Sequence, residues 1–152
     1  MTILAIQVAG PAEAAIKGCF TRTYDAAHLA KHQGQDVTVM RIQIGFEPNS
    51  EDDENMLVLR LRGSNTTLLN GFVCVERGPV THCKIIDSGN NSALGGSFVL
   101  KPKGDAVLLE PEGDIMLAEE GTFTPRKLNV AKNPEHKIFK LTRLGTSQCP
   151  GL

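Results

Sequence analysis

Short segments in which apolar and polar residues alternate recur along the chain and are separated by turn residues. In residues 37–46 the even-numbered positions carry mostly apolar side chains, whereas Arg41 and Gln43 belong to the opposite face. Leucines occupy every second position of residues 57–62 in the same way. A period of two is typical of a half-buried β-strand. Further strands are predicted at residues 17–23, 97–101, 106–110, 114–118 and 136–144.

One segment predicts a helix instead. Asp25 occupies an N-cap position, residues 26–32 are mostly good helix formers, and Gly34 follows as a stop signal. About eight or nine short strands with one short N-terminal helix are typical of a mainly β chain that folds as a single-domain antiparallel barrel or sandwich. We therefore expect one β domain over residues 16–152. Its interior-facing positions, which either fill a core or hold one small ligand, would include Met40, Ile42, Ile44, Leu57, Leu59 and Leu61.

Cys74 and Cys83 stand at mirror-image positions of the segment FVCVERGPVTHCKII, which predicts a β-hairpin with a two-residue turn at Gly78-Pro79. Counting outward from that turn, the two cysteines face each other in a non-hydrogen-bonded pair, the closer kind of pair in an antiparallel ladder. A disulfide needs such a short Cβ separation. The register therefore predicts a bond between Cys74 and Cys83.

Cys19 and Cys149 are the remaining cysteines, and a bond between them would join the two ends of the domain. Four cysteines allow three pairings, and the sequence alone does not choose among them. Structural disulfides are typical of oxidising compartments, so we expect a periplasmic or secreted protein. Residues 1–15 are small and mostly apolar, with residues 12–14 in the small-x-small form of a signal-peptidase site. We interpret them as a signal-peptide remnant or as a flexible tail.

Two histidines on the predicted helix could carry metal chemistry. His28 and His32 are four residues apart and share a helix face, and Asp25 lies three residues before the first of them. Two imidazoles at that spacing can hold one metal ion, although Leu29 stands where the metallohydrolase motif has a Glu. The other interpretation is a capping Asp25 beside two ordinary polar histidines. Further metal ligands could come from His82 and His136.

The overall composition argues against several function classes. The 16 Lys and Arg residues are balanced by 17 Asp and Glu residues, which gives no electrostatic reason to expect nucleic acid or an anionic membrane as a partner. No apolar run approaches the roughly 20 residues of a membrane-spanning helix. The acidic run at residues 51–54 lacks the ligand spacing of a calcium loop and predicts a solvated hairpin tip. We find no motif for a nucleophile or a phosphate loop, and we expect no cofactor.

The segment YDAAHLAKHQGQDV, residues 24–37, is followed later in the chain by a histidine-cysteine pair and a glycine-glycine turn. With these features the chain resembles small uncharacterised exported proteins of Gram-negative bacteria. The resemblance implies export and no known activity. Residues 87–88 and a longer insertion stand where the family pattern has another cysteine, so the resemblance implies no disulfide pairing. The matching residues are Tyr24, His28, Leu29, His32, Gln35, Val37, His82, Cys83, Gly95, Gly96 and Phe98.

Three functional hypotheses remain open at this point. The first is a noncatalytic module that binds a small apolar ligand or a protein partner, because strands are abundant and catalytic motifs are not found. A metal-dependent enzyme built on Asp25, His28 and His32 is one alternative. An inhibitor of a periplasmic enzyme, acting through the Gly-, Ser- and Asn-rich residues 87–96, is the other.

Overall fold

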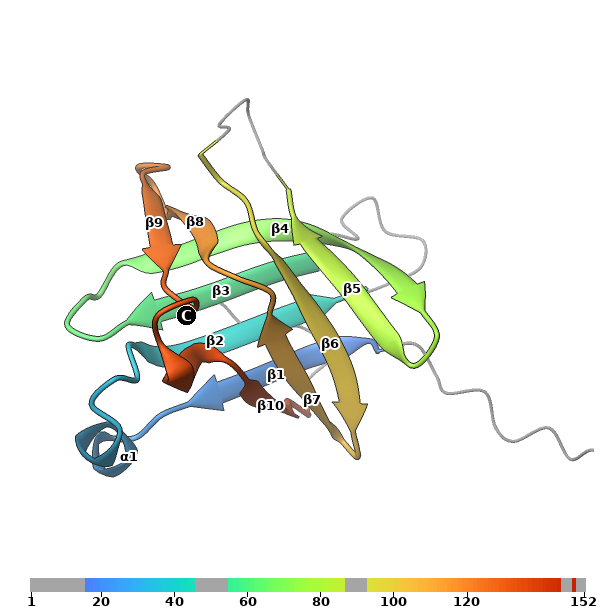
Figure 1. Cartoon of the computed structure of the whole chain (residues 1–152), viewed down its shortest axis with the longest axis horizontal. Coiled ribbons are helices and arrows are strands. Elements are labelled where there is room, and N and C mark those ends of the chain that lie inside the picture. Colours follow the sequence, from blue (N-terminus) through green and yellow to red (C-terminus); the bar gives the residue numbers. More distant parts are fainter. Residues whose placement is uncertain (1–15, 46–54, 87–92, 146–148, 150–152) are drawn as a thin grey trace, which may run out of the picture.

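The computed structural model of the protein describes residues 16–45, 55–86, 93–145 and Cys149. Within these residues the chain forms ten β-strands, one α-helix and one 3-10 turn (Figure 1). The elements are β1 (Gly18–Thr23), α1 (Ala26–Lys31), β2 (Val37–Ile44), β3 (Asn55–Leu61), β4 (Thr67–Arg77), β5 (Val80–Ile85), β6 (Ser97–Lys103), β7 (Ala106–Pro111), β8 (Ile115–Glu119), β9 (Pro125–Leu128), η1 (Pro134–His136) and β10 (Phe139–Arg143).

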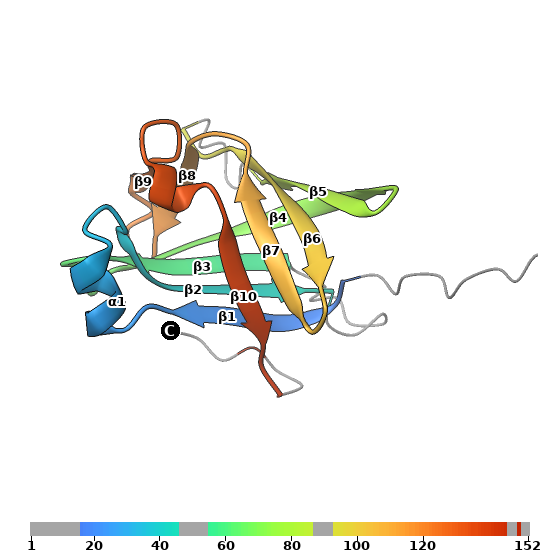
Figure 2. The same cartoon turned by 60° about the horizontal axis from the view of Figure 1, so that its bottom comes forward.

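Eight of the strands close into an antiparallel barrel. Their order is β3-β2-β1-β10-β7-β6-β5-β4, and the pairing of β3 with β4 completes the ring. The remaining strands, β8 and β9, form a hairpin that joins the edge of β4 through Leu68↔Glu119 and Leu69↔Ala118. This hairpin lies with η1 at one end of the barrel (Figure 2). The prediction of a mainly β fold with one short helix is confirmed, and of its two architectures the barrel is the one observed.

The barrel interior is filled by the side chains that alternation predicts to face it. Met40, Ile42, Leu57 and Leu59 are completely buried, and Leu61 packs against the same cluster. The rings of Phe72 and Phe98 meet edge to face inside the barrel, with centroids 5.1 Å apart. The β8–β9 hairpin extends this cluster with Ile115, Leu117 and Leu128. These interior positions therefore form a core.

Helix α1 covers part of the same end of the barrel and is fixed at both of its ends. Asp25 caps it, since its Oδ1 accepts the backbone N–H of His28 at 2.7 Å. At the other end Arg62, which follows β3, donates to the carbonyl oxygens of Leu29, His32 and Gln35 at 2.9–3.1 Å. Carbonyls at a helix C-terminus have no partner within the helix, so one guanidinium satisfies the end of α1 and ties it to the barrel.

The C-terminal third differs from the prediction in two places. Residues 125–128, where no strand was predicted, form β9, which tolerates Pro125 because an edge strand needs fewer backbone donors. His136 was expected to open the last strand, but Asn133 and Pro134 start a 3-10 turn there and β10 begins at Phe139. The acidic run at 51–54, residues 87–92 of the glycine-rich segment and residues 1–15 lie outside the described residues.

His136 is completely buried, and both of its ring nitrogens are engaged. Its Nε2 accepts the backbone N–H of Asp36 at 3.1 Å. Its Nδ1 lies 2.6 Å from the carbonyl oxygen of Asn129. Since Nε2 is an acceptor, this network assigns the ring proton to Nδ1. The neutral imidazole therefore joins the start of β2 to the segment after β9.

Asp114, in the turn before β8, holds the segment that follows β9. Its Oδ1 accepts the backbone N–H groups of Val130 and Ala131 at 2.7 and 3.0 Å. The N–H donors of Ala131 and Val130 stabilise the carboxylate and lower the pKa of Asp114 below its ordinary value of 3.8. A carboxyl group whose pKa is lower in the folded state stabilises the fold above its unfolded-state pKa. That stabilisation is lost as the pH falls through the folded-state pKa.

We expect the wild-type protein to lose more stability than an Asp114→Asn variant when the pH falls from about 6 to about 2. The Asn side chain keeps an acceptor oxygen but does not titrate. At the upper pH the variant should be the less stable protein, because hydrogen bonds to a charged acceptor are stronger. Urea unfolding midpoints over this pH range measure both effects. Parallel pH profiles for the two proteins would contradict this role of Asp114.

Candidate functional site

The hairpin disulfide forms in the predicted register. Arg77 pairs with Val80 beside the turn, and Cys74 pairs with Cys83 three positions further along. The two cysteines are bonded, with Cα atoms 4.1 Å apart. Cys83 is 2% exposed and belongs to the barrel core. This bond is therefore part of the core packing.

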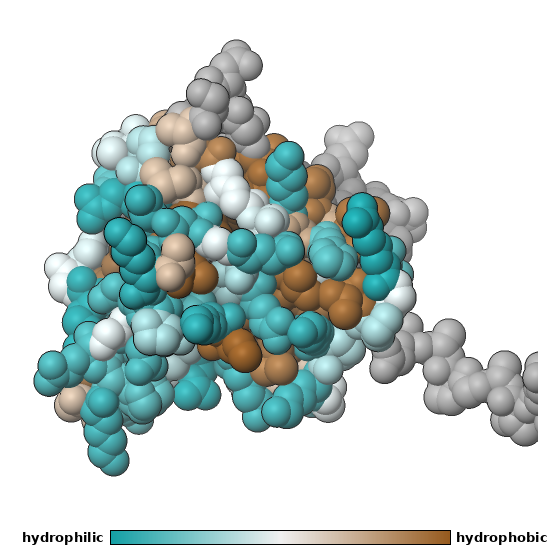
Figure 3. Space-filling view, in the orientation of Figure 1, coloured by the Kyte–Doolittle hydropathy of each residue, from teal (hydrophilic) through white to brown (hydrophobic). Residues whose placement is uncertain are grey.

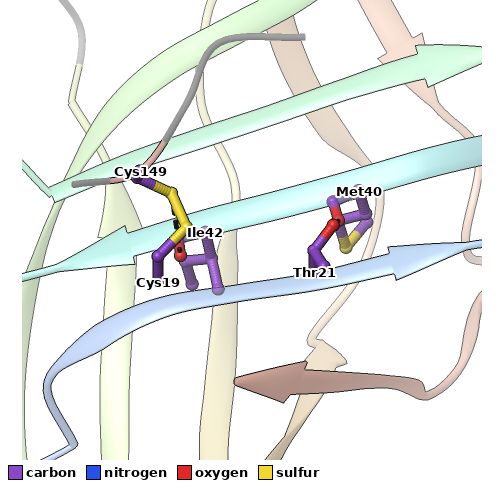
Figure 4. The surroundings of a disulfide bond; sticks show 5 residues. All are labelled: Cys19, Thr21, Met40, Ile42 and Cys149. Carbon is purple, nitrogen blue, oxygen red and sulfur yellow. Dashed lines mark hydrogen bonds between the residues drawn. A yellow bond between two sulfur atoms is a disulfide. The ribbon is translucent and has the colours of Figure 1, made fainter. Parts of the chain in front are cut away.

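The second disulfide joins Cys149 to Cys19 on the outer face of β1 (Figure 4). Sγ of Cys149 lies 3.9 Å from the carbonyl oxygen of Ile42 on β2. Figure 4 shows Cys149 placed against β1 and β2, which explains why Cys19 is only 1% exposed. No cysteine of the chain is free. Two structural disulfides are typical of an oxidising, extracytoplasmic compartment.

The three residues predicted as metal ligands lie within α1 or cap its ends, and their contacts serve its packing. Asp25 is the N-cap, and the rings of His28 and His32 stack with centroids 4.2 Å apart. Nδ1 of His32 lies 3.3 Å from Oε1 of Glu135, which links α1 to η1. Within the described parts of the chain no three His, Cys, Asp or Glu side chains are placed to share a metal ion. His82 lies apart from this group on β5, and His136 uses both ring nitrogens within the fold.

Tyr24 extends this cluster toward the barrel. Its ring centroid lies 4.9 Å from that of His28, and the guanidinium carbon of Arg22 lies 4.9 Å from the Tyr24 ring. Burial raises the pKa of Tyr24, while the positive charge of Arg22 acts in the opposite direction. Gln35, 2% exposed, donates to the carbonyl of Val37 at 3.1 Å. Tyr24 and Val37 thus pack against the barrel core, and Gln35 is buried beside them.

A groove on the outer face of β4, which we call the β4 groove, is the better candidate for binding. Its volume is about 340 Å³. The strand brings apolar side chains to its outer face, and Gly71, which has no side chain, leaves space between them. All of the lining residues are uncharged, so the groove favours an apolar ligand. They are Asn55, Met56, Leu69, Asn70, Gly71, Phe72, Val73, Ile86, Ala118 and Phe123.

Asn70 positions the walls of the β4 groove. Its Nδ2 donates to the carbonyl of Ile86 at 2.9 Å, and its Oδ1 accepts the N–H of Ala118 at 3.1 Å. The end of β5 and the strand β8 are thereby both attached to the middle of β4. Asn55 is also engaged, since its Oδ1 accepts the N–H of Gly45 and its Nδ2 donates to the carbonyl of Phe72. The polar groups of the groove therefore hold its shape.

Phe123, in the turn between β8 and β9, has an unusual backbone and an exposed ring. Its φ of 58° lies in the left-handed region, where no other described residue except glycine is found. A bulky residue in that region is strained. The Phe123 side chain is 72% exposed, and Val73 and Ile86 beside it in the groove are 56% and 40% exposed. The fold thus keeps a strained, solvent-exposed aromatic ring at the rim of an apolar groove.

Sequence reasoning missed the β4 groove, although one signal was available. Outward positions of the hairpin, including Leu69, Val73 and Val75, are as apolar as the inward ones. A strand with one solvated face would carry polar residues there. Figure 3 shows the surface of the molecule in the orientation of Figure 1. Hydrophilic residues cover the side that carries α1 and β9, and apolar patches appear between polar residues toward β5 and β6.

Comparison with known proteins adds no identification. No protein-family model, curated protein or solved structure matches the chain. Among the described residues no helix is long and apolar enough to cross a membrane.

Proposed function

We propose that this protein is an exported, noncatalytic binding module that holds a small apolar ligand in the β4 groove. The observation that carries the proposal is the exposed ring of Phe123, kept in a strained backbone conformation at the rim of an uncharged groove. A left-handed phenylalanine costs free energy, and its ring gains little burial within the fold. A ligand that covers the ring would offset this cost.

The chemistry of the groove supports binding without catalysis. Both asparagine side chains in its lining are hydrogen-bonded within the fold. No lining residue carries an acid, a base or a nucleophile suited to a reaction. Affinity would therefore come from apolar contact and shape. A volume of about 340 Å³ is at the lower end of the usual range for small-ligand pockets.

The proposed location is the periplasm or the extracellular space. The two disulfides favour an oxidising compartment. The resemblance to exported proteins of Gram-negative bacteria agrees with that location. A protein partner that inserts an apolar side chain into the groove is the second candidate, because the apolar surface continues onto Val75, 57% exposed on the same outer face.

A neutral fluorescent probe, N-phenyl-1-naphthylamine, tests ligand binding directly. The variant Phe123→Asn removes the ring, and Asn tolerates a left-handed backbone better than Phe does. We expect the variant to bind the probe about tenfold more weakly and to be at least as stable as the wild type. Ile138→Asn is the matched control, because Ile138 is 53% exposed and does not line the groove.

Filling the groove provides a second, independent test. A Cβ atom at Gly71 would meet only Asn55 O at 3.6 Å and Ile86 Cδ1 at 3.7 Å, which are ordinary contacts. Gly71→Val should therefore occupy the groove, and it raises the strand propensity of β4. We expect a folded protein that no longer binds the probe. Unchanged probe affinity in both Phe123→Asn and Gly71→Val would overturn the proposed function.

A further inference from the structure

A second hollow, which we call the β9-edge slot, lies between β9 and the turn that follows β3 and has a volume of about 260 Å³. One wall is the turn that leaves β3, and the other is β9 with the residue after it. Consecutive residues 126–129 all line the slot, so the edge of β9 forms this wall. The lining residues are Asp36, Leu61, Arg62, Gly63, Ser64, Arg126, Lys127, Leu128, Asn129 and His136.

The edge of β9 that borders the slot carries backbone N–H and C=O groups that do not bond to β8. In the described part of the chain β9 pairs with β8 alone. The N–H of Glu119 donates to the carbonyl of Thr124 at 2.9 Å, so these two residues form a hydrogen-bonded pair. From there, non-hydrogen-bonded and hydrogen-bonded pairs alternate along β8 and β9. Met116 and Lys127 are then a non-hydrogen-bonded pair, and Met116 makes its two backbone bonds to Gly95 on its other side. The N–H and C=O of Lys127 therefore point away from β8.

The charges around the slot are mostly positive. Arg62, Arg126 and Lys127 line it, against one carboxylate, that of Asp36. The hydrogen bonds of the Arg62 side chain go to backbone carbonyls, so no carboxylate neutralises it within the described residues. Nη1 of Arg126 lies 3.4 Å from Oε1 of Glu119, and the Arg126 side chain is 51% exposed. Nζ of Lys127 lies 3.9 Å from Oδ2 of Asp114, and the Lys127 side chain is 58% exposed. Such exposed pairs are weak and can exchange partners.

We propose that the β9-edge slot accepts an extended segment of a partner protein that carries acidic side chains. The segment would pair with the backbone of Lys127 and place carboxylates beside Arg62 and Arg126. Addition of a strand to an exposed sheet edge is a general mode of peptide recognition. Cationic side chains on the edge repel a basic strand and attract an acidic one. This proposal uses a different surface from the β4 groove and does not depend on it.

The test uses fluorescence anisotropy with a labelled, end-blocked peptide, Thr-Glu-Val-Glu-Val-Glu-Thr, and the whole protein. Three comparison peptides are used. One replaces each Glu by Lys, and the other two methylate alternate backbone nitrogens, one peptide in each phase. We expect the acidic peptide to bind and the basic one not to bind. Methylation in one phase should abolish binding, because it removes the N–H groups that would face Lys127. Binding that is indifferent to side-chain charge, or to methylation in both phases, would overturn the proposal.

Charge reversal on the protein locates the site. The double variant Arg126→Glu with Lys127→Glu should bind the acidic peptide at least about fivefold more weakly than the wild type. The control, Lys103→Glu with Lys140→Glu, makes the same change of net charge at exposed positions of β6 and β10. Lys127→Glu alone serves if the double variant unfolds. Equal losses of affinity for the acidic peptide in the slot variant and the control variant would contradict the assignment of the site to the slot. Gly71→Val, which changes the β4 groove, should leave peptide binding unchanged.

Discussion

Replacing Cys19 and Cys149 together by alanine is expected to lower the free energy of unfolding by about 5 kcal/mol. The bond closes a loop with a sequence separation of 130 residues, and the entropy that a cross-link removes from the unfolded chain grows with loop length. The folded state should persist, because β10 still pairs with β1 and the N–H of Leu144 still donates to the carbonyl of Cys19 at 2.8 Å. Urea denaturation of both proteins measures the loss.

The hairpin disulfide is the matched comparison. Its sequence separation is only 9, so the same entropy argument gives about 2.5 kcal/mol for Cys74→Ala with Cys83→Ala. Cys83 lies in the core, and the cavity left there adds a cost to this variant. A loss below about 2 kcal/mol for the Cys19 and Cys149 variant would show that chain entropy is not the main contribution of that bond.

Gly96→Ala is expected to destabilise the protein by about 2–4 kcal/mol. The φ of Gly96 is +117°, which L side chains rarely adopt. A Cβ atom there would lie 3.0 Å from both Asp114 O and Ile115 Cα, and backbone atoms cannot move aside as a side chain does. The close approach exists because Gly95 bridges to Met116 in β8 while Gly96 accepts the N–H of Ile85. Thermal and urea unfolding of the variant measure the effect.

Gly95→Ala provides the control within the same turn. A Cβ atom at Gly95 meets nothing within 4 Å, and the φ of this residue is not positive. The variant should therefore stay close to wild-type stability. If the free energy of unfolding fell equally in Gly95→Ala and Gly96→Ala, the effect would come from stiffening of the turn in general. The close contact of Gly96 with β8 would then not be its cause.

Local patterns predicted much of this fold. The alternation over residues 37–46 and 57–62 placed Met40, Ile42 and Leu57 in the interior, and all three are fully buried. The hairpin register was correct to the residue, because a two-residue turn determines every pair beyond it. The cap at Asp25 was also correct, since capping depends on a side chain and backbone groups only three positions apart.

The candidate sites were harder to predict, because they depend on neighbours distant in sequence. Whether Val73 is covered depends on the β8–β9 hairpin, which joins β4 beside Leu69 and leaves the following stretch open. The partner of His32 is Glu135, 103 residues away. β9 has no period-two pattern, and its pairing with β8 makes it a strand. The apolar outward positions of β4 indicate a surface to be covered, but no local pattern says whether the fold itself covers it.

The sequence by itself determined most of the strands, the short helix and the Cys74–Cys83 hairpin, because alternation, capping and tight turns act over a few residues. Only the tertiary structure decided that the sheet closes through β3 and β4, that Cys19 meets Cys149, and that apolar residues on the outer face of β4 remain exposed. These outcomes depend on which distant strands lie side by side. An apolar side chain favours burial equally against any neighbour, so its identity alone does not say whether a core, a ligand or a partner will cover it.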